Sequence, residues 1–165
     1  MTERKTSDPR GLAASPAGAP EGAWMLITGG SRGIGAACAR LAAAEGWRIA
    51  ISYREAADEA DALVRALTAS GTQAFAVRAD VADEAQVMAL FDAIDRAGGP
   101  LGALVNNAGV VAPAARLEDF TLARIERVMR INVIGAMLCA REAVRRMSHR
   151  RGGRGGSIVN VSSVA

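Results

Sequence analysis

A glycine-rich stretch, residues 28–35, is the part of this sequence whose residue types and spacing point most directly to chemistry. It runs Thr28-Gly29-Gly30-Ser31-Arg32-Gly33-Ile34-Gly35, between an apolar run and a stretch of helical period. Glycine permits a positive φ in a tight turn, and its missing Cβ lets backbone N–H groups approach a ligand. The positive end of the helix that begins there attracts anions. We therefore expect this loop to bind the diphosphate of a dinucleotide, although a plain strand-to-helix turn would use similar residues.

The rest of the chain supplies the alternating elements that such a loop requires. Short apolar runs predict five strands, at residues 24–28, 48–53, 73–79, 103–106 and 157–161. Stretches of helical period lie between them, at residues 34–45, 56–69, 84–96 and 121–147. This alternation predicts an α/β fold: a doubly wound, Rossmann-like parallel sheet of order 3-2-1-4-5 between two layers of helices, a three-layer α/β/α arrangement. The glycine loop then lies at the carboxyl end of the first strand, where ligands bind.

The last predicted helix carries an apolar stripe and one polar residue beside it. Apolar residues recur there every three or four positions, and we expect them to face the sheet: Leu122, Ile125, Met129, Val133, Ala136, Met137, Ala140 and Val144. Asn132 lies one position before Val133, where an amide is costly unless its hydrogen bonds are satisfied. A neighbouring backbone carbonyl is one partner that would satisfy it.

Two motifs in this sequence resemble those of the short-chain dehydrogenase/reductase family. Thr28, Gly29, Gly33 and Gly35 match its T-G-x-x-x-G-x-G loop, which differs from the G-x-G-x-x-G of other dinucleotide-binding families. After the fourth apolar run, Asn106-Asn107-Ala108-Gly109 is similar to its N-N-A-G signature. The resemblance covers about residues 23–165 and is nearest to NADP-type bacterial enzymes of the glucose 1-dehydrogenase and 3-oxoacyl-carrier-protein reductase kinds. It implies hydride transfer between NADP(H) and a small-molecule carbonyl or alcohol substrate.

The residues after the second predicted strand favour NADP over NAD. Enzymes that prefer NAD usually place Asp or Glu there to accept hydrogen bonds from the ribose, whereas this sequence has Ser52, Tyr53 and Arg54. Arg54 and Arg32 offer guanidinium donors to the 2′-phosphate of NADP, which a carboxylate would repel. Solvated surface charge is the alternative for both arginines. Glu55 is the main objection, because an error of one residue in the strand boundary would bring an acid to the ribose.

Asp80 and Val81 follow the third predicted strand, and the resemblance implies that they flank the adenine. Asp80 could instead cap the next helix, although Asp83 is the better-placed cap. The small residues Ala108 and Gly109, after the fourth strand, permit close approach of a flat ring and ribose. The predicted coenzyme-binding residues are therefore Thr28, Gly29, Ser31, Arg32, Gly33, Ile34, Gly35, Tyr53, Arg54, Asp80, Val81, Asn106, Ala108 and Gly109.

The resemblance also implies two catalytic residues. Asn132 corresponds to the asparagine that organises a water-linked proton relay, and Ser163 to the serine that hydrogen-bonds the substrate carbonyl, with Ser162 as the alternative. The family's Tyr-Lys pair would follow this serine, but the chain ends first, and its only tyrosine and lysine are Tyr53 and Lys5. A phenol with a pKa of about 10 needs a nearby cation to move protons near neutral pH. We therefore expect no appreciable turnover from this polypeptide alone.

Composition indicates a soluble globular protein. Half of the 165 residues are apolar, the net charge is +3, and no apolar run approaches the ~20 residues that cross a bilayer. We expect a cytoplasmic protein without a signal peptide, with a flexible tail over residues 1–22 and a dinucleotide-binding domain over residues 23–165 that is truncated after the fifth strand. Cys38 and Cys139 lie in apolar helical patterns without CxxC spacing, which predicts buried thiols and no metal site. The full-length protein is expected to be a homo-oligomer, and an exposed fifth strand predicts marginal stability.

Two other interpretations of the sequence stay open. A non-catalytic NADP-binding or scaffolding module would carry the same glycine loop without the catalytic pair. The segment Arg150-Arg151-Gly152-Gly153-Arg154-Gly155-Gly156 could be an RNA-binding arginine/glycine stretch. It is short and lacks aromatic residues, so a helix-to-strand loop is the better interpretation, and we expect no nucleic-acid partner.

Overall fold

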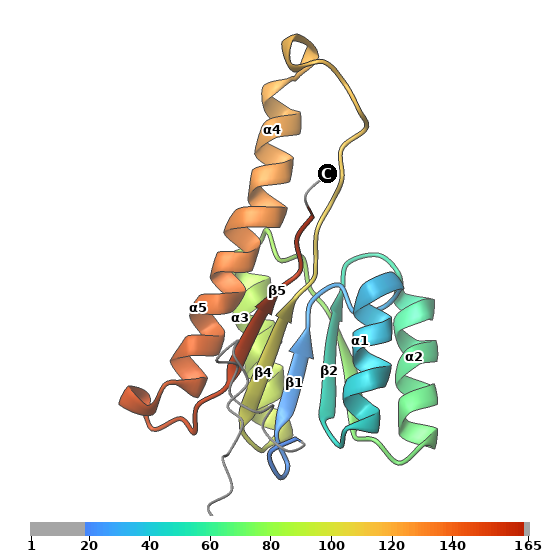
Figure 1. Ribbon diagram of the computed structural model, residues 1–165, viewed down its shortest axis with the longest axis vertical. Coiled ribbons are helices and arrows are strands. Elements are labelled where there is room, and N and C mark those ends of the chain that lie inside the picture. Colours follow the sequence, from blue (N-terminus) through green and yellow to red (C-terminus); the bar gives the residue numbers. More distant parts are fainter. Residues whose placement is uncertain (1–18, 164–165) are drawn as a thin grey trace, which may run out of the picture.

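A computed structural model describes residues 19–163 and contains a sheet of five parallel strands (Figure 1). The strands are β1 (Trp24–Ile27), β2 (Arg48–Tyr53), β3 (Ala74–Arg78), β4 (Leu101–Asn106) and β5 (Ser157–Asn160). Their order is β3-β2-β1-β4-β5, which confirms the predicted order. In the centre, Leu26 of β1 pairs with Ala50 of β2 and with Leu104 of β4. Because all the pairs are parallel, the carboxyl ends of the five strands share one edge of the sheet.

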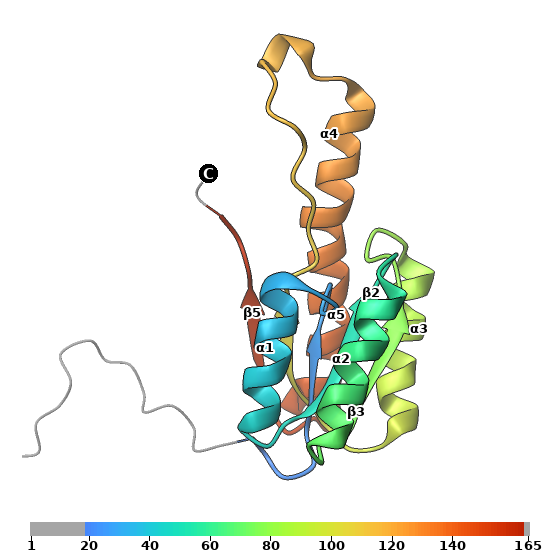
Figure 2. The same ribbon diagram turned by 90° about the vertical axis from the view of Figure 1, so that its right-hand side faces the viewer.

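Helices cover both faces of this sheet (Figures 1 and 2). One face carries α1 (Gly33–Ala44) and α2 (Ala57–Ala69), whereas the other carries α3 (Glu84–Ala97) and α5 (Ala136–Met147). The side chains of β1 alternate between the two layers: Ile27 packs with the helices α1 and α2, and Leu26 packs with α3 and α5. The sheet is therefore buried on both faces, as parallel sheets usually are, and the three-layer α/β/α arrangement is confirmed.

The long predicted helix is present but is not regular throughout. It begins as α4 (Leu122–Val128), widens into the π-helical turn η2 (Met129–Gly135) and continues as α5. Thr121 caps its start, because the Thr121 hydroxyl accepts a hydrogen bond from the backbone N–H of Arg124. Such π turns are often found at functional sites, and this one contains Asn132. Figure 1 shows α4 rising past the carboxyl ends of the strands.

The apolar stripe predicted to face the sheet lies on the wrong side of this helix. Six of its eight residues are exposed, among them Leu122 at 69% and Met137 at 67%. Small residues decide which side packs, since a Cβ added to Gly135 would come within 2.8 Å of the Val81 side chain. The helix can approach the body of the domain only on that side. The residues that are buried there recur every four positions: Ile131, Gly135, Cys139, Ala143 and Met147.

A buried carboxylate, Glu142, joins α5 to its surroundings through arginines. The Glu142 carboxylate accepts hydrogen bonds from Arg145 at 2.7 Å, from Arg146 at 3.0 Å and from Arg141 at 3.1 Å. Arg146 also reaches Asp95 on α3 at 2.7 Å. Burial by itself would raise the pKa of Glu142, but the hydrogen bonds from Arg146 and Arg141 and the nearby positive charges outweigh it and hold the pKa below its ordinary value of 4.5. The ion pair between Arg146 and Asp95 thus links α5 to α3.

Both cysteines are free thiols, but only Cys139 is buried, because Cys38 is half-buried. Burial, followed by the charge of Glu142, raises the pKa of Cys139 to about 12. Within residues 19–163 no group of three or more potential metal ligands is found. In that same part of the chain, no helix has both the length and the apolar character needed to cross a membrane.

The arginine/glycine segment forms the connection between α5 and β5. A short 3-10 helix, η3 (His149–Arg151), begins it, and Gly152 and Gly155 adopt positive φ angles before the chain enters β5. The helix-to-strand interpretation is therefore confirmed. Residues 1–18 of the predicted tail, which include Lys5, lie outside the described residues. Residues 19–22 lead through a turn into β1.

Candidate functional site

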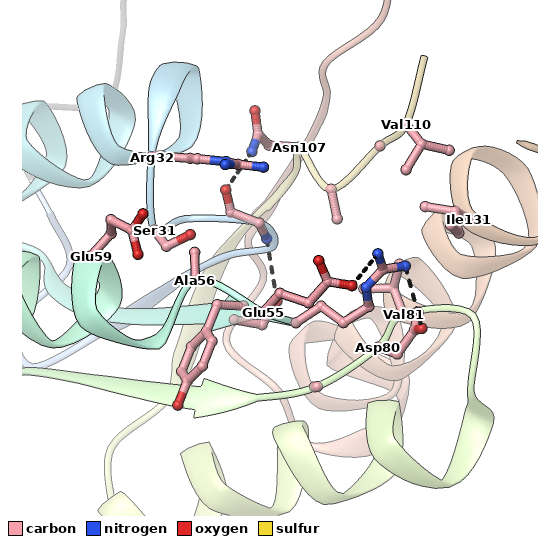
Figure 3. Close-up of a pocket in the computed structure, with 17 residues that line it drawn as sticks. Ser31, Arg32, Glu55, Ala56, Glu59, Asp80, Val81, Asn107, Val110 and Ile131 are labelled. Carbon is pink, nitrogen blue, oxygen red and sulfur yellow. Dashed lines mark hydrogen bonds and ion pairs between the residues drawn. The ribbon is translucent and has the colours of Figure 1, made fainter. Parts of the chain in front are cut away.

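A groove of about 530 Å³ lies at the carboxyl edge of the sheet. Its walls are formed by the segments that follow β1, β2, β3 and β4, together with Ile131 from the π-helical turn (Figure 3). The parallel strands thus bring together loops that are far apart in sequence, as expected for a ligand site in an open α/β sheet. Nine of the predicted coenzyme-binding residues line the groove: Gly29, Ser31, Arg32, Tyr53, Arg54, Asp80, Val81, Ala108 and Gly109.

The glycines of the loop are required for two separate reasons. Gly29 and Gly33 have φ angles of +63° and +56°, in the left-handed region that other residues avoid. At Gly35 the limit is space, because a Cβ would come 2.5 Å from the carbonyl oxygen of Gly29. Gly30, to which the motif assigned no role, is equally restricted: its Cβ would lie 2.6 Å from the side chain of Ile51. The loop is therefore held close to both β2 and the start of α1.

The amino end of α1 has no side-chain cap. Arg32 is the N-cap residue, its side chain makes no capping hydrogen bond, and the first turn contains no acidic residue. The backbone N–H groups at this end are therefore open to an anion, and the helix dipole favours one there. Gly33 and Ile34 belong to this turn rather than to the lining of the groove.

Thr28 is buried beneath the glycine loop and does not line the groove. Its side chain is buried, and its hydroxyl oxygen accepts hydrogen bonds from the backbone N–H of Asn107 at 3.1 Å and of Ala108 at 3.0 Å. In return, the Asn107 side-chain amide donates to the carbonyl oxygens of Thr28 at 2.9 Å and Gly29 at 3.0 Å. These four bonds fasten the end of β1 to the end of β4. Asn107 is not among the predicted coenzyme-binding residues, although its place in the N-N-A-G motif was a signal for such a role.

Asn106 also lies outside the groove. It is buried, and its amide donates to the carbonyl oxygen of Ala136 at 3.1 Å and to the side-chain oxygen of Asn160 at 2.9 Å. It therefore joins the end of β4 to the start of α5 and to the end of β5. This placement is that of a residue that positions the elements around the groove.

Charged residues gather where β2 and β3 end. The Arg54 guanidinium lies 2.6 Å from the Glu55 carboxylate and 3.9 Å from that of Asp80. In Figure 3, dashed lines mark these two ion pairs, which end on the labelled Glu55 and Asp80. Glu59 also lines the groove. The strand boundary was predicted correctly, since β2 ends at Tyr53, yet Glu55 still lines the groove. Both the basic residues that favour NADP and the acid that opposes it are therefore present.

Asp80 does not cap α3. Asp83 does so, because its carboxylate accepts hydrogen bonds from the backbone N–H groups of Ala85 and Gln86. The Gln86 side-chain amide also donates a hydrogen bond to the Asp83 carboxylate. This bond has the largest effect on the pKa of Asp83, and with the two backbone bonds it lowers that pKa. Asp80 instead accepts a hydrogen bond from the N–H of Ala82 at 2.9 Å and turns its other oxygen toward Arg54.

Asn132 is hydrogen-bonded to a single residue of the chain that follows β4. Its side-chain oxygen accepts from the backbone N–H of Val110, and its amide donates to the carbonyl oxygen of Val110, both at 2.9 Å. The alternative that the sequence left open for Asn132, a hydrogen bond to a backbone carbonyl, is therefore present. Asn132 itself is exposed, so burial is not what requires these bonds. They join the π-helical turn to the wall of the groove at Val110.

Ser162 and Ser163 follow β5 and are exposed at the same edge of the sheet. The strand ends at Asn160, and the N–H of Val161 donates to the carbonyl oxygen of Asn106 at 2.9 Å. Neither serine lines the groove.

A short chain dehydrogenase family model matches residues 23–165. The chain belongs to the short-chain dehydrogenase family. It is 51% identical over 140 residues to the uncharacterized oxidoreductase YgfF of Escherichia coli, covering 85% of this chain and 57% of that protein. It is 35% identical over 144 residues to the 3-oxoacyl-[acyl-carrier-protein] reductase FabG of Staphylococcus aureus, covering 84% of this chain and 55% of that protein. The chain thus spans about half the length of the curated relatives that it matches.

Solved structures of short-chain dehydrogenases share this fold. A short chain dehydrogenase from Burkholderia cenocepacia, in complex with NADP, has a TM-score of 0.80 and 40% sequence identity, over 87% of this chain and 56% of that one. The enzyme from Serratia marcescens BCRC 10948 has a TM-score of 0.79 and 35% identity, over 86% of this chain and 56% of that one. The Rossmann-like fold and the family are therefore established for this short-chain dehydrogenase. Its membership favours an oxidoreductase over a scaffolding module.

Proposed function

We propose that this short-chain dehydrogenase binds NADP(H) in the groove and that the longer protein transfers a hydride between NADP(H) and a carbonyl or alcohol substrate. The observation that carries the proposal is the uncapped amino end of α1, which opens beside the glycine loop at the carboxyl edge of the sheet. A site of this form suits a diphosphate. We further propose a cytoplasmic homo-oligomer for the longer protein, in keeping with the sequence analysis.

In this proposal the chain's residues bind and orient the coenzyme. Gly29 and Ser31 line the diphosphate site, while Arg32 and Arg54 offer charge-assisted hydrogen bonds to a 2′-phosphate. Asp80 would accept a hydrogen bond from the adenine amino group. The coenzyme itself would supply a nicotinamide ring that gives or takes the hydride.

Asn132 and Ser163 are proposed to act on the substrate side. Asn132 would hold a water-linked proton path, and Ser163, or Ser162 in its place, would hydrogen-bond the substrate carbonyl. The described residues contain one tyrosine, Tyr53, which ends β2, whereas Asn132 lies in the π-helical turn. Lys5 lies outside the described residues. We therefore propose that the 165-residue chain binds the coenzyme without appreciable turnover.

Calorimetry on the 165-residue chain with NADP⁺ and with NAD⁺ tests this proposal. We expect saturable binding of NADP⁺ and no oxidation of NADPH over a panel of aldehydes and ketones. Circular dichroism confirms that the material is folded. Folded protein that gives no heat with either coenzyme would refute the proposed function, and turnover would refute the assignment of an inactive chain.

A further inference from the structure

Arg54 is paired with carboxylates of its own chain. Its guanidinium lies 2.6 Å from the Glu55 carboxylate and 3.9 Å from that of Asp80. The backbone at this point is held as well, because the Arg78 side chain donates a hydrogen bond to the carbonyl oxygen of Arg54 at 3.1 Å. The guanidinium that suits a 2′-phosphate is therefore occupied by carboxylates of the same chain.

The groove as a whole is not basic. Three carboxylates line it, those of Glu55, Glu59 and Asp80, against the two guanidinium groups of Arg32 and Arg54. A 2′-phosphate would add further negative charge to this set, and like charges in proximity are repulsive. The 2′-phosphate of NADP therefore adds less binding free energy at this site than the two arginines alone would supply.

The two carboxylates beside Arg54 differ in how easily they can leave. Asp80 is held in position by the hydrogen bond from the N–H of Ala82 and is 31% exposed at its side chain. The Glu55 side chain is 76% exposed, and its only ion pair among residues 19–163 is the one with Arg54. Exposed pairs of this kind are weak enough to exchange partners. Glu55 is thus the partner that a phosphate can displace.

We propose that Glu55 is a specificity-determining residue, whose carboxylate competes with the 2′-phosphate of NADP for Arg54 and so narrows the preference for NADP over NAD. The inference rests on the proposed function, because it concerns the same groove. Binding of NADP exchanges the Glu55–Arg54 pair for a phosphate–Arg54 pair and leaves Glu55 in solvent. Binding of NAD leaves the Glu55–Arg54 pair intact.

The test compares dissociation constants of NADP⁺ and NAD⁺ for the 165-residue chain and for Glu55→Gln. Glutamine keeps the shape of the side chain and removes its charge, so Arg54 is released. We expect Glu55→Gln to bind NADP⁺ about threefold to tenfold more tightly and NAD⁺ equally or less tightly. Adenosine 2′,5′-bisphosphate and AMP, which differ only by the 2′-phosphate and report only on this end of the groove, should show the same contrast.

Two further variants separate this mechanism from a general effect of charge. Asp58→Asn removes one negative charge from the exposed start of α2, outside the groove lining, and should leave the ratio of the two constants within about twofold. In Arg54→Gln the added change Glu55→Gln should no longer tighten NADP⁺ binding. A gain equal to that of Asp58→Asn, a gain that persists without Arg54, or an unchanged ratio would each overturn the inference. Absence of binding by either coenzyme would instead refute the proposed function.

Discussion

At the scale of single residues, the shape of the groove depends on glycines in places that leave no room for a Cβ and on buried polar side chains. Gly35 leaves room for the carbonyl of Gly29, and the buried Thr28 hydroxyl accepts two backbone N–H groups from the end of β4. Neither contributes a side chain to the groove lining. Their effect is to set the position of the residues that do.

Gly35→Ala should weaken binding of NADP⁺ by more than about tenfold. The new Cβ would lie 2.5 Å from the Gly29 oxygen and 2.6 Å from the Asn107 amide, so the loop must move away from α1. Calorimetry measures the loss, and circular dichroism checks the fold. Ala37→Ser, an exposed change in the same helix, is the control. Equal affinities for Gly35→Ala and the unmodified chain would contradict the close contact.

Thr28→Val should lower the free energy of unfolding by about 2 kcal/mol, because it leaves the N–H groups of Asn107 and Ala108 without their acceptor at nearly constant volume. Urea melts provide the measurement. Thr28→Ser keeps the hydroxyl and should cost less than valine does. The reverse order would show that the methyl group, not the hydroxyl, is what matters.

At the scale of elements, charge as well as apolar packing holds α5 in place. Glu142 is 5% exposed and faces three arginines of its own helix, one of which continues to Asp95 on α3. Removing one partner of a buried pair is costly because the other charges lose their compensation. The π-helical turn that precedes α5 contacts the surroundings of the groove through Ile131, through the Asn132–Val110 hydrogen bonds and through Gly135, which lies against Val81.

Glu142→Gln should destabilise the domain by about 2 kcal/mol near neutral pH, less than for a fully buried pair because Arg146 keeps Asp95 and Arg145 is half-exposed. The pKa of Glu142 lies below its ordinary 4.5 in the folded state. The contribution of the Glu142 charge to the free energy of unfolding is therefore complete at a pH above 4.5 and is lost as the pH falls through the lowered pKa of the folded state. Urea melts from neutral to acid pH should show the two proteins converging in acid. The exposed Glu118, paired with Arg116, serves as control, and Glu118→Gln should have no measurable effect.

At the scale of the whole molecule, β5 is the more exposed of the two edge strands, because most of its residues are exposed whereas most of those of β3 are half-buried. β5 pairs only with β4 among the described strands, and Val159 and Val161 are 53% and 38% exposed. The expected marginal stability of the 165-residue chain follows from this edge, which offers unpaired backbone groups and apolar side chains to another chain.

Val159→Lys should reduce self-association of the 165-residue chain without lowering its urea midpoint. A charge on an edge strand opposes pairing with a second strand, and the site is already exposed. Light scattering across a concentration series measures the association. Ile158→Lys is the contrasting variant. Ile158 packs against the core formed with α3 and α5, so its replacement by lysine should destabilise the fold. Unchanged scattering for Val159→Lys would rule out β5 as the associating edge.

The sequence by itself determined the types and order of the elements and the position of the glycine loop. These follow from local features: the period of apolar residues, the conformational freedom of glycine, and the rule that parallel strands present their carboxyl ends together. The nine predicted residues that line the groove came from these features together with the family resemblance, which supplied Asp80 and Val81. Even the boundary of β2, on which the choice of coenzyme depended, was predicted to the residue.

Only the tertiary structure decided which side of the long helix meets the sheet and which polar side chains serve the backbone. Two stripes on that helix have apolar character, and the choice of the one through Gly135 depends on its distance from Val81, some fifty residues away in sequence. The Thr28 side chain is buried because its partner Ala108 follows β4. The Asn106 side chain is buried because its partners lie on α5 and β5. Arg54 comes within 3.9 Å of Asp80 for a similar reason: periodicity places a side chain on an element, whereas contacts in three dimensions bring the ends of β2 and β3 together.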